Sequence, residues 1–154
     1  MLPVNDIIIR EATDLDSPAI ASLMTQLGYP TAPAEMRARL ISILSHADYH
    51  TFVTELQGMV VGMVGICLGI LYEKNGLHGR LLALVVDERW RGQGIGETLV
   101  AQAEEWIRAC GGSLVIVNSS SHRIEAHRFY LRLGYELTGV RLVKFLIEDK
   151  RHLK

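Results

Sequence analysis

The chain has 154 residues, of which 49% are hydrophobic and 21% charged, a composition typical of a globular domain with a sizeable core. Sixteen basic and 17 acidic side chains leave a net charge of −1, which gives no support for a nucleic-acid or anionic-membrane partner. No apolar run reaches the length of a membrane span, and no basic-then-apolar leader follows Met1. The two cysteines, Cys67 and Cys110, stand in apolar surroundings, so we expect reduced core residues of a cytoplasmic protein.

The first half of the chain predicts a strand, two helices and a β-hairpin. The strand covers residues 7–10, and Ser17, as a candidate cap, begins a helix that ends at Gly28. After a break over residues 29–33, a second helix has four apolar residues on one face, which are Met36, Leu40, Ile43 and Leu44. Residues 50–56 and 59–68 then alternate like two strands around a Gln57-Gly58 turn.

The second half predicts a buried strand over residues 81–86, a helix from Gly94 to Gly111 and a strand over residues 114–117. A helix over residues 124–133, capped by Gly134, and a last strand over residues 141–147 follow. The element order predicts one α/β domain over residues 1–154, with a mixed sheet and helices on both of its faces.

The segment between the buried strand and the third helix is rich in glycine: Arg91, Gly92, Gln93, Gly94, Ile95 and Gly96, followed by Glu97. Glycines let the backbone turn tightly and approach a ligand, and the start of a helix presents unpaired N–H groups. A strand, a glycine turn and a helix start together form a phosphate site. The chain has neither the Lys-Ser or Lys-Thr pair of a P-loop nor the third glycine of a dinucleotide fingerprint.

Two spans, residues 81–96 and 126–135 (AHRFYLRLGY), together resemble the GNAT family of acyl-CoA-dependent N-acetyltransferases. The resemblance implies the GNAT fold, a mostly antiparallel mixed sheet with a splayed parallel strand pair at its centre. It also implies acetyl-CoA as co-substrate and transfer of its acetyl group to a primary amine, by direct attack in a ternary complex. The R-x-x-G-x-G loop on Arg91, Gly94 and Gly96 would hold the CoA pyrophosphate.

The resemblance also assigns roles around the reacting thioester. The backbone of Leu84, Val85 and Val86 would pair with the pantetheine arm, and the Val85 N–H would face the thioester oxygen as an oxyanion donor. Tyr130, four residues before Gly134, would face the sulfur, because a phenol of pKa about 10 can protonate a departing thiolate. Asn118 and Arg123 complete the expected CoA contacts, although Arg123 could equally bind an anionic acceptor or cap the loop.

The general base and the acceptor are less well defined by the residues. The strand before the loop carries no carboxylate, so the candidates for the base are Glu73 and His78, in the segment before that strand. Tyr29, Tyr72 and Glu73 are the expected acceptor-lining residues. The string from Arg123 to Tyr130 resembles a GNAT branch that includes aminoalkylphosphonate and aminoglycoside acetyltransferases, which favours a small-molecule amine.

Two other functions stay open: acetylation of a protein N-terminus or lysine, and acyl-CoA binding by a sensor module without turnover. The six histidines lack the spacing of a zinc site, so we expect no metal. Exposed sheet edges and the apolar last strand leave a homodimer open.

Overall fold

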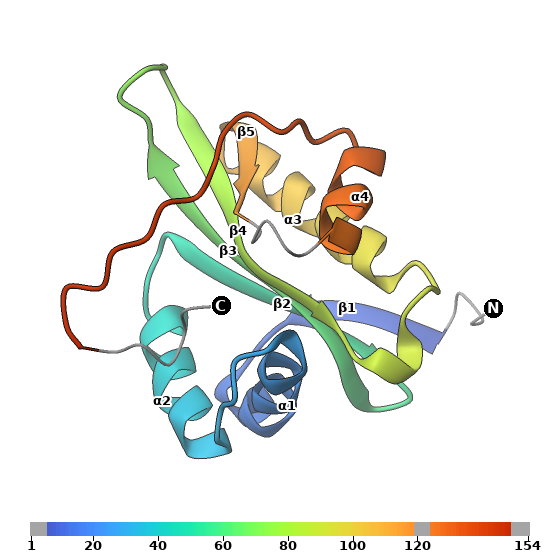
Figure 1. The fold of residues 1–154 in the computed structure, drawn as a ribbon. Helices are drawn as coiled ribbons and strands as arrows, with labels where there is room; N and C mark the ends of the chain where they lie inside the picture. Colours follow the sequence, from blue (N-terminus) through green and yellow to red (C-terminus); the bar gives the residue numbers. More distant parts are fainter. Residues whose placement is uncertain (1–5, 119–123, 149–154) are drawn as a thin grey trace. The chain divides into compact units, whose positions relative to one another are not determined.

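The computed structural model describes residues 6–118 and 124–148, which belong to two compact units, Met1–Val117 and Asn118–Lys154 (Figure 1). The expectation of one domain over residues 1–154 therefore stays a prediction. No helix in the described ranges is long and apolar enough to cross a bilayer.

The first unit holds a five-stranded sheet in the order β1-β2-β3-β4-β5. Its strands and helices follow in chain order: β1 (Ile7–Glu11), α1 (Ser17–Leu27), α2 (Pro33–Leu44), β2 (Tyr49–Leu56), β3 (Met59–Ile70), β4 (Leu77–Val86), α3 (Ile95–Ala109) and β5 (Gly112–Val117). Within the second unit, α4 (Ile124–Arg132) follows. The expected hairpin over β2 and β3 is confirmed, and a left-handed turn at Gln57 and Gly58 closes it.

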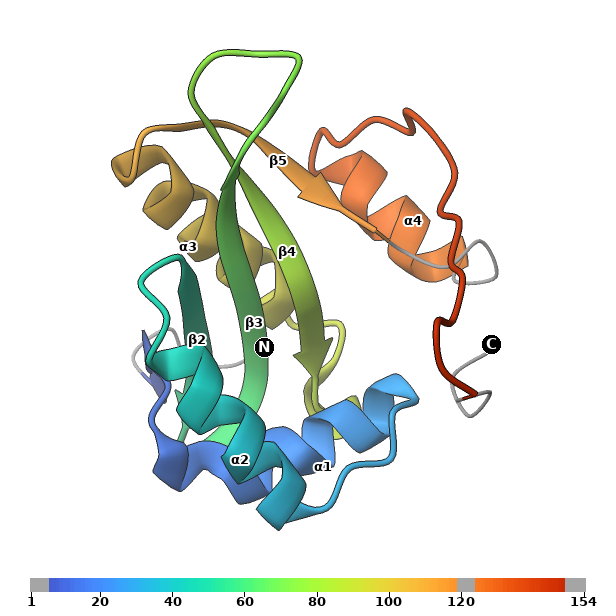
Figure 2. The same ribbon diagram turned by 90° about the vertical axis from the view of Figure 1, so that its left-hand side faces the viewer.

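Helices cover the two faces of the sheet separately (Figure 2). On one face, α1 and α2 bury a cluster with side chains of β2, β3 and β4, which include Ile20, Leu23, Leu40, Val53, Met63 and Val85. On the other face, α3 buries the apolar stripe that the sequence predicts, including Ile95, Leu99, Ala103 and Ile107. A Cβ built at Gly62 of β3 would lie 3.1 Å from Leu99 Cδ1, so this glycine lets α3 approach the sheet closely.

Strands β1 to β4 pair antiparallel, and β4 pairs parallel with β5. The parallel pairing runs only from Leu77–Gly112 to Leu81–Val117, so the second half of β4 continues without β5 beside it. The strands therefore part after Leu81, as the resemblance implies. The pair lies at the edge of the described sheet, however, and not at its centre.

The predicted strand over residues 141–147 is wrong. In the structure this segment makes no ladder, and its apolar side chains are exposed, with Leu142 at 89% and Leu146 at 90%. A strand exists only where a second strand takes up its backbone hydrogen bonds, and the β-propensity of a segment cannot supply that partner.

Two smaller expectations also need correction. Cys110 is exposed rather than a core residue, because it follows the last turn of α3, where the buried stripe has ended; Cys67 is half-buried, and both thiols are free. Ser17 is the first residue of α1 and not its cap, since its hydroxyl bonds back to the Asp14 carbonyl.

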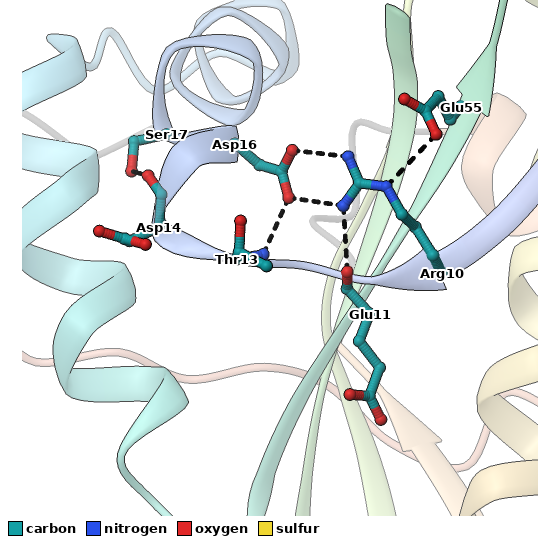
Figure 3. A network of polar contacts seen from close by, with 7 residues as sticks. All are labelled: Arg10, Glu11, Thr13, Asp14, Asp16, Ser17 and Glu55. Carbon is teal, nitrogen blue, oxygen red and sulfur yellow. Dashed lines mark hydrogen bonds and ion pairs between the residues drawn. The ribbon is translucent and has the colours of Figure 1, made fainter. Parts of the chain in front are cut away.

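A polar network ties the end of β1 to the start of α1 (Figure 3). The Arg10 guanidinium donates to both carboxylate oxygens of Asp16, at 2.9 and 2.8 Å, and lies 3.4 Å from Glu55 on β2. Asp16 also accepts the Thr13 N–H at 2.8 Å, and the Arg10 bonds hold the pKa of this buried carboxyl below its usual range. These bonds fix the position of the first residue of α1 relative to β1 and β2.

Candidate active site

The glycine-rich segment forms a turn between β4 and α3. Gly92 and Gly94 have φ of +75° and +84°, a conformation that favours glycine, and a Cβ at either would meet no atom within 4 Å. Gly94 precedes the first helical residue, so no side chain caps α3. Among the described residues, no side chain accepts the first N–H groups of α3, from Ile95 to Glu97, and their partial positive charge suits an anion.

Backbone and side-chain bonds hold this turn against β4. The Asp87 N–H donates to Val61 of β3 at 2.8 Å, and the Trp90 N–H donates to Asp87 at 2.9 Å. Arg91, expected to add charge at the phosphate, donates from Nε to the Val86 carbonyl at 2.9 Å. Its guanidinium is thereby anchored beside the end of β4, with its remaining N–H groups available to an anion.

A charged cluster that the sequence analysis missed lies directly before the turn. Asp87 is 7% exposed and accepts bonds from the backbone and side chain of Arg89, which lower the pKa of Asp87 to about 2. Gln26, near the end of α1, donates to Asp87 at 3.3 Å and accepts the Glu88 N–H at 2.9 Å. The only signal in the sequence was a lone aspartate after an apolar strand, which does not reveal a partner 61 residues away.

After Leu81, the N–H and C=O groups of successive β4 residues point alternately toward β3 and away from it. Because the Asp87 N–H bonds to Val61, residues 85 and 87 direct their N–H and C=O groups toward β3 in this antiparallel ladder. Leu84 and Val86 then direct theirs toward the edge that β5 leaves after Leu81. The bond from Arg91 to the Val86 carbonyl fits this alternation.

The structure does not bring the expected acceptor-lining residues together. Tyr29 follows α1 near Gln26 and so lies toward the Asp87 end of β4, whereas Tyr72 and Glu73 lie in the exposed turn before β4. The ten residues of β4 separate its Asp87 end from the turn before it by about 30 Å. Figures 1 and 2 show the α1–α2 connection and the β3–β4 connection at opposite ends of the sheet.

His78, expected before the strand, belongs to β4 and is 8% exposed. The His78 ring packs against Gly69, since a Cβ built at Gly69 would lie 2.8 Å from His78 Cε1. The ring atom Nδ1 has no hydrogen-bond partner in the described part of the chain.

The second unit holds the predicted tyrosine helix. The Tyr130 ring lies 5.2 Å from Phe129 and 5.4 Å from Tyr135, both edge-on, and Tyr135 donates its N–H to the Tyr130 carbonyl at 3.0 Å. Gly134, with φ of +94°, makes this helix end as the sequence predicts. Asn118 directly follows β5, and Arg123 lies outside the described residues.

Comparisons with known proteins agree with this geometry. The model of the acetyltransferase (GNAT) family matches residues 17–135. The aminoalkylphosphonate N-acetyltransferase of Salmonella typhimurium is 32% identical over 143 residues, which cover 90% of each chain. The type 1 aminoglycoside N(6')-acetyltransferase of Stenotrophomonas maltophilia is 30% identical over 84% of this chain and 86% of its own.

Among solved structures, a GNAT family acetyltransferase of Staphylococcus aureus superposes with a TM-score of 0.79 at 28% identity, over 92% of this chain and 99% of that chain. The sequence relatives and the structural neighbour thus belong to one activity class. The chain belongs to the GNAT family and is an acyl-CoA-dependent N-acetyltransferase.

Proposed function

We propose that this enzyme transfers the acetyl group of acetyl-CoA to a primary amine of a small molecule, by direct attack in a ternary complex. One observation carries the proposal: β4 continues past the end of its ladder with β5 at Leu81, unpaired on that side within the first unit, and runs into a glycine turn and a helix start that no side chain caps. An edge whose backbone groups at Leu84 and Val86 point away from β3 suits an extended amide-bearing arm, and the helix start suits a pyrophosphate.

The loop residues from Arg91 to Glu97 would hold the pyrophosphate through N–H groups and the Arg91 guanidinium. The pantetheine arm would extend along β4 and pair with the outward-facing groups of Leu84 and Val86. The alternation along β4 favours these two N–H groups over that of Val85 as donors to the thioester oxygen. Asn118 and Arg123 remain proposed contacts of the same co-substrate.

When bound, acetyl-CoA supplies an activated thioester. The amine nitrogen attacks the carbonyl carbon, and a backbone N–H of β4 stabilises the oxyanion that forms. Tyr130 donates its phenolic proton to the sulfur as the C–S bond breaks. The attacking nitrogen loses its proton to water, because Leu81, Leu82 and Ala83 offer no carboxylate and His78 is buried.

Two of the relatives support a small acceptor, since their names give an aminoalkylphosphonate and an aminoglycoside as the molecules acetylated. Both acceptors carry primary amines on small, highly polar molecules. We therefore infer an acceptor of that size for this enzyme.

The test is thiol release from acetyl-CoA across a panel of polyamines, aminoglycosides, aminoalkylphosphonates, amino acids and short peptides, with acetyl-CoA affinity measured by calorimetry. We expect micromolar-range binding and turnover with one small-molecule class. Turnover with peptides alone would identify a protein acetyltransferase. Tight binding with a flat panel would instead indicate an acyl-CoA sensor.

A further inference from the structure

Arg80 stands in β4 at the point where β4 and β5 part. It pairs with Ile116, and the next pair, Leu81 with Val117, is the last of the parallel ladder. Within the proposed function, the thioester lies beside Leu84, four residues or about 13 Å further along β4. The pantetheine arm occupies the side toward the glycine turn, so a small acceptor must approach the thioester from the side of Arg80. A side chain here is therefore placed to contact the acceptor.

Register fixes the face to which Arg80 points. A Cβ at the neighbouring Gly79 would overlap the Ile107 side chain, so position 79 faces α3. Successive side chains of a strand alternate, and Arg80 thus points to the face that α1 and α2 share. Its partner on β3 is Cys67, which is half-buried, and Tyr49 beyond it is exposed. Within the described residues of the first unit, this part of the face is therefore only partly covered.

The Arg80 guanidinium is a half-buried cation without a carboxylate bound to it. In residues 6–118 and 124–148 it makes no ion pair and no side-chain hydrogen bond, although its charge acts on the Cys67 thiol, as does that of Asp48. A charge taken partly out of water is normally paired, because desolvation penalises it. The guanidinium fork binds carboxylate, phosphate or sulfonate oxygens in bidentate fashion.

The phosphates of CoA are too distant to be this anion. The six residues from Arg80 to Val86 span about 20 Å, and the glycine turn lies beyond them. We propose that Arg80 binds an anionic group of the acceptor, so that the substrate is a small amine that also carries a phosphonate, phosphate, sulfonate or carboxylate. This inference rests on the proposed function and adds the acceptor's second functional group.

The test compares matched acceptors with and without the anion: 2-aminoethylphosphonate, taurine and β-alanine against propylamine and ethanolamine. We expect the wild-type kcat/KM to favour one anionic acceptor by at least about tenfold. Arg80→Gln should abolish that preference while the KM for acetyl-CoA stays unchanged, and Arg80→Lys should keep part of it. Arg108→Gln, which removes an exposed arginine on α3, is the matched control and should behave as wild type.

Equal activity of the wild type toward charged and uncharged acceptors, or an equal loss toward both in Arg80→Gln, would overturn the inference. If no amine is acetylated, the proposed function fails, and calorimetry of 2-aminoethylphosphonate and β-alanine with the CoA-saturated protein decides about Arg80. Binding that Arg80→Gln removes would support the anion site, and absence of binding to the wild type would refute it.

Discussion

The carboxamide of Gln26, near the end of α1, is bonded at both of its ends to the turn that follows β4. Its Nε2 lies 3.3 Å from Asp87 Oδ2, and its Oε1 accepts the Glu88 N–H at 2.9 Å. One side chain of α1 thereby fixes the chain four residues before Gly92. The arrangement links α1 to the loop proposed to bind CoA.

We expect Gln26→Ala to raise the KM for acetyl-CoA by about fivefold, because two hydrogen bonds worth about 1 kcal/mol in total are lost from the support of the loop. The kcat should change little, since Gln26 touches no reacting atom. Steady-state kinetics with acetyl-CoA as the varied substrate measures the split. Gln102→Ala on α3, which makes no side-chain hydrogen bond within the described ranges, is the control. A fall in kcat with unchanged KM would contradict this role.

Gly94→Ala tests the glycine turn against a matched position. Gly94 and Gly58 have nearly the same φ, +84° and +80°, and neither would bring a Cβ within 4 Å of another atom. Both substitutions should cost about 1 kcal/mol of folding free energy through the left-handed conformation alone. Only Gly94→Ala should weaken acetyl-CoA binding, which calorimetry would detect. Equal affinities of the two variants would remove Gly94 from the phosphate site.

Tyr130→Phe should lower kcat by about 100-fold, since it removes the proposed proton donor to the thiolate. The phenyl ring keeps its packing against Phe129 and Tyr135, so the fold of α4 and the affinity for acetyl-CoA should be retained. Single-turnover thiol release, with affinity from calorimetry, separates the two effects. Unchanged turnover would exclude Tyr130 as the acid.

Asp16 should make folding stability depend on pH. Its pKa is held below the usual value by Arg10, so its contribution is present above about pH 4 and is lost as the pH falls through the lowered native pKa. At pH 7, Asp16→Asn should cost about 2 kcal/mol of unfolding free energy. Urea unfolding at pH 7, 5, 4 and 3 should show this difference from wild type shrink toward acid.

The control for that series is Asp14→Asn in the same turn. The Asp14 side chain is 40% exposed, and its Oδ2 lies 3.4 Å from Arg37 Nη2. Its loss should cost less than about 0.5 kcal/mol at every pH. An equally large cost for Asp14→Asn, or a cost for Asp16→Asn that does not vary with pH, would disprove the assignment.

Local patterns predicted most of the elements. The apolar stripe from Ile95 to Ile107 and the alternation around Gln57-Gly58 are confirmed as α3 and the β2–β3 hairpin. Helical and strand periodicities depend on nearest turns and neighbours, so they can be read within one segment. The segment over residues 141–147 has the same strand-like composition but no ladder, because pairing requires a second segment that the pattern cannot name.

The same distinction holds for the candidate site. The sequence by itself determined the glycine turn at Gly92 and Gly94 and the end of α4 at Gly134, because a left-handed backbone conformation favours glycine at a single position. The motifs built on these glycines also determined the family. Only the tertiary structure decided that Gln26 holds Asp87, that Tyr29 lies far from Tyr72, and that Arg80 stands where β4 leaves β5. Strand register and helix docking bring together residues distant along the chain, and their long-range contacts leave no local signal in the sequence.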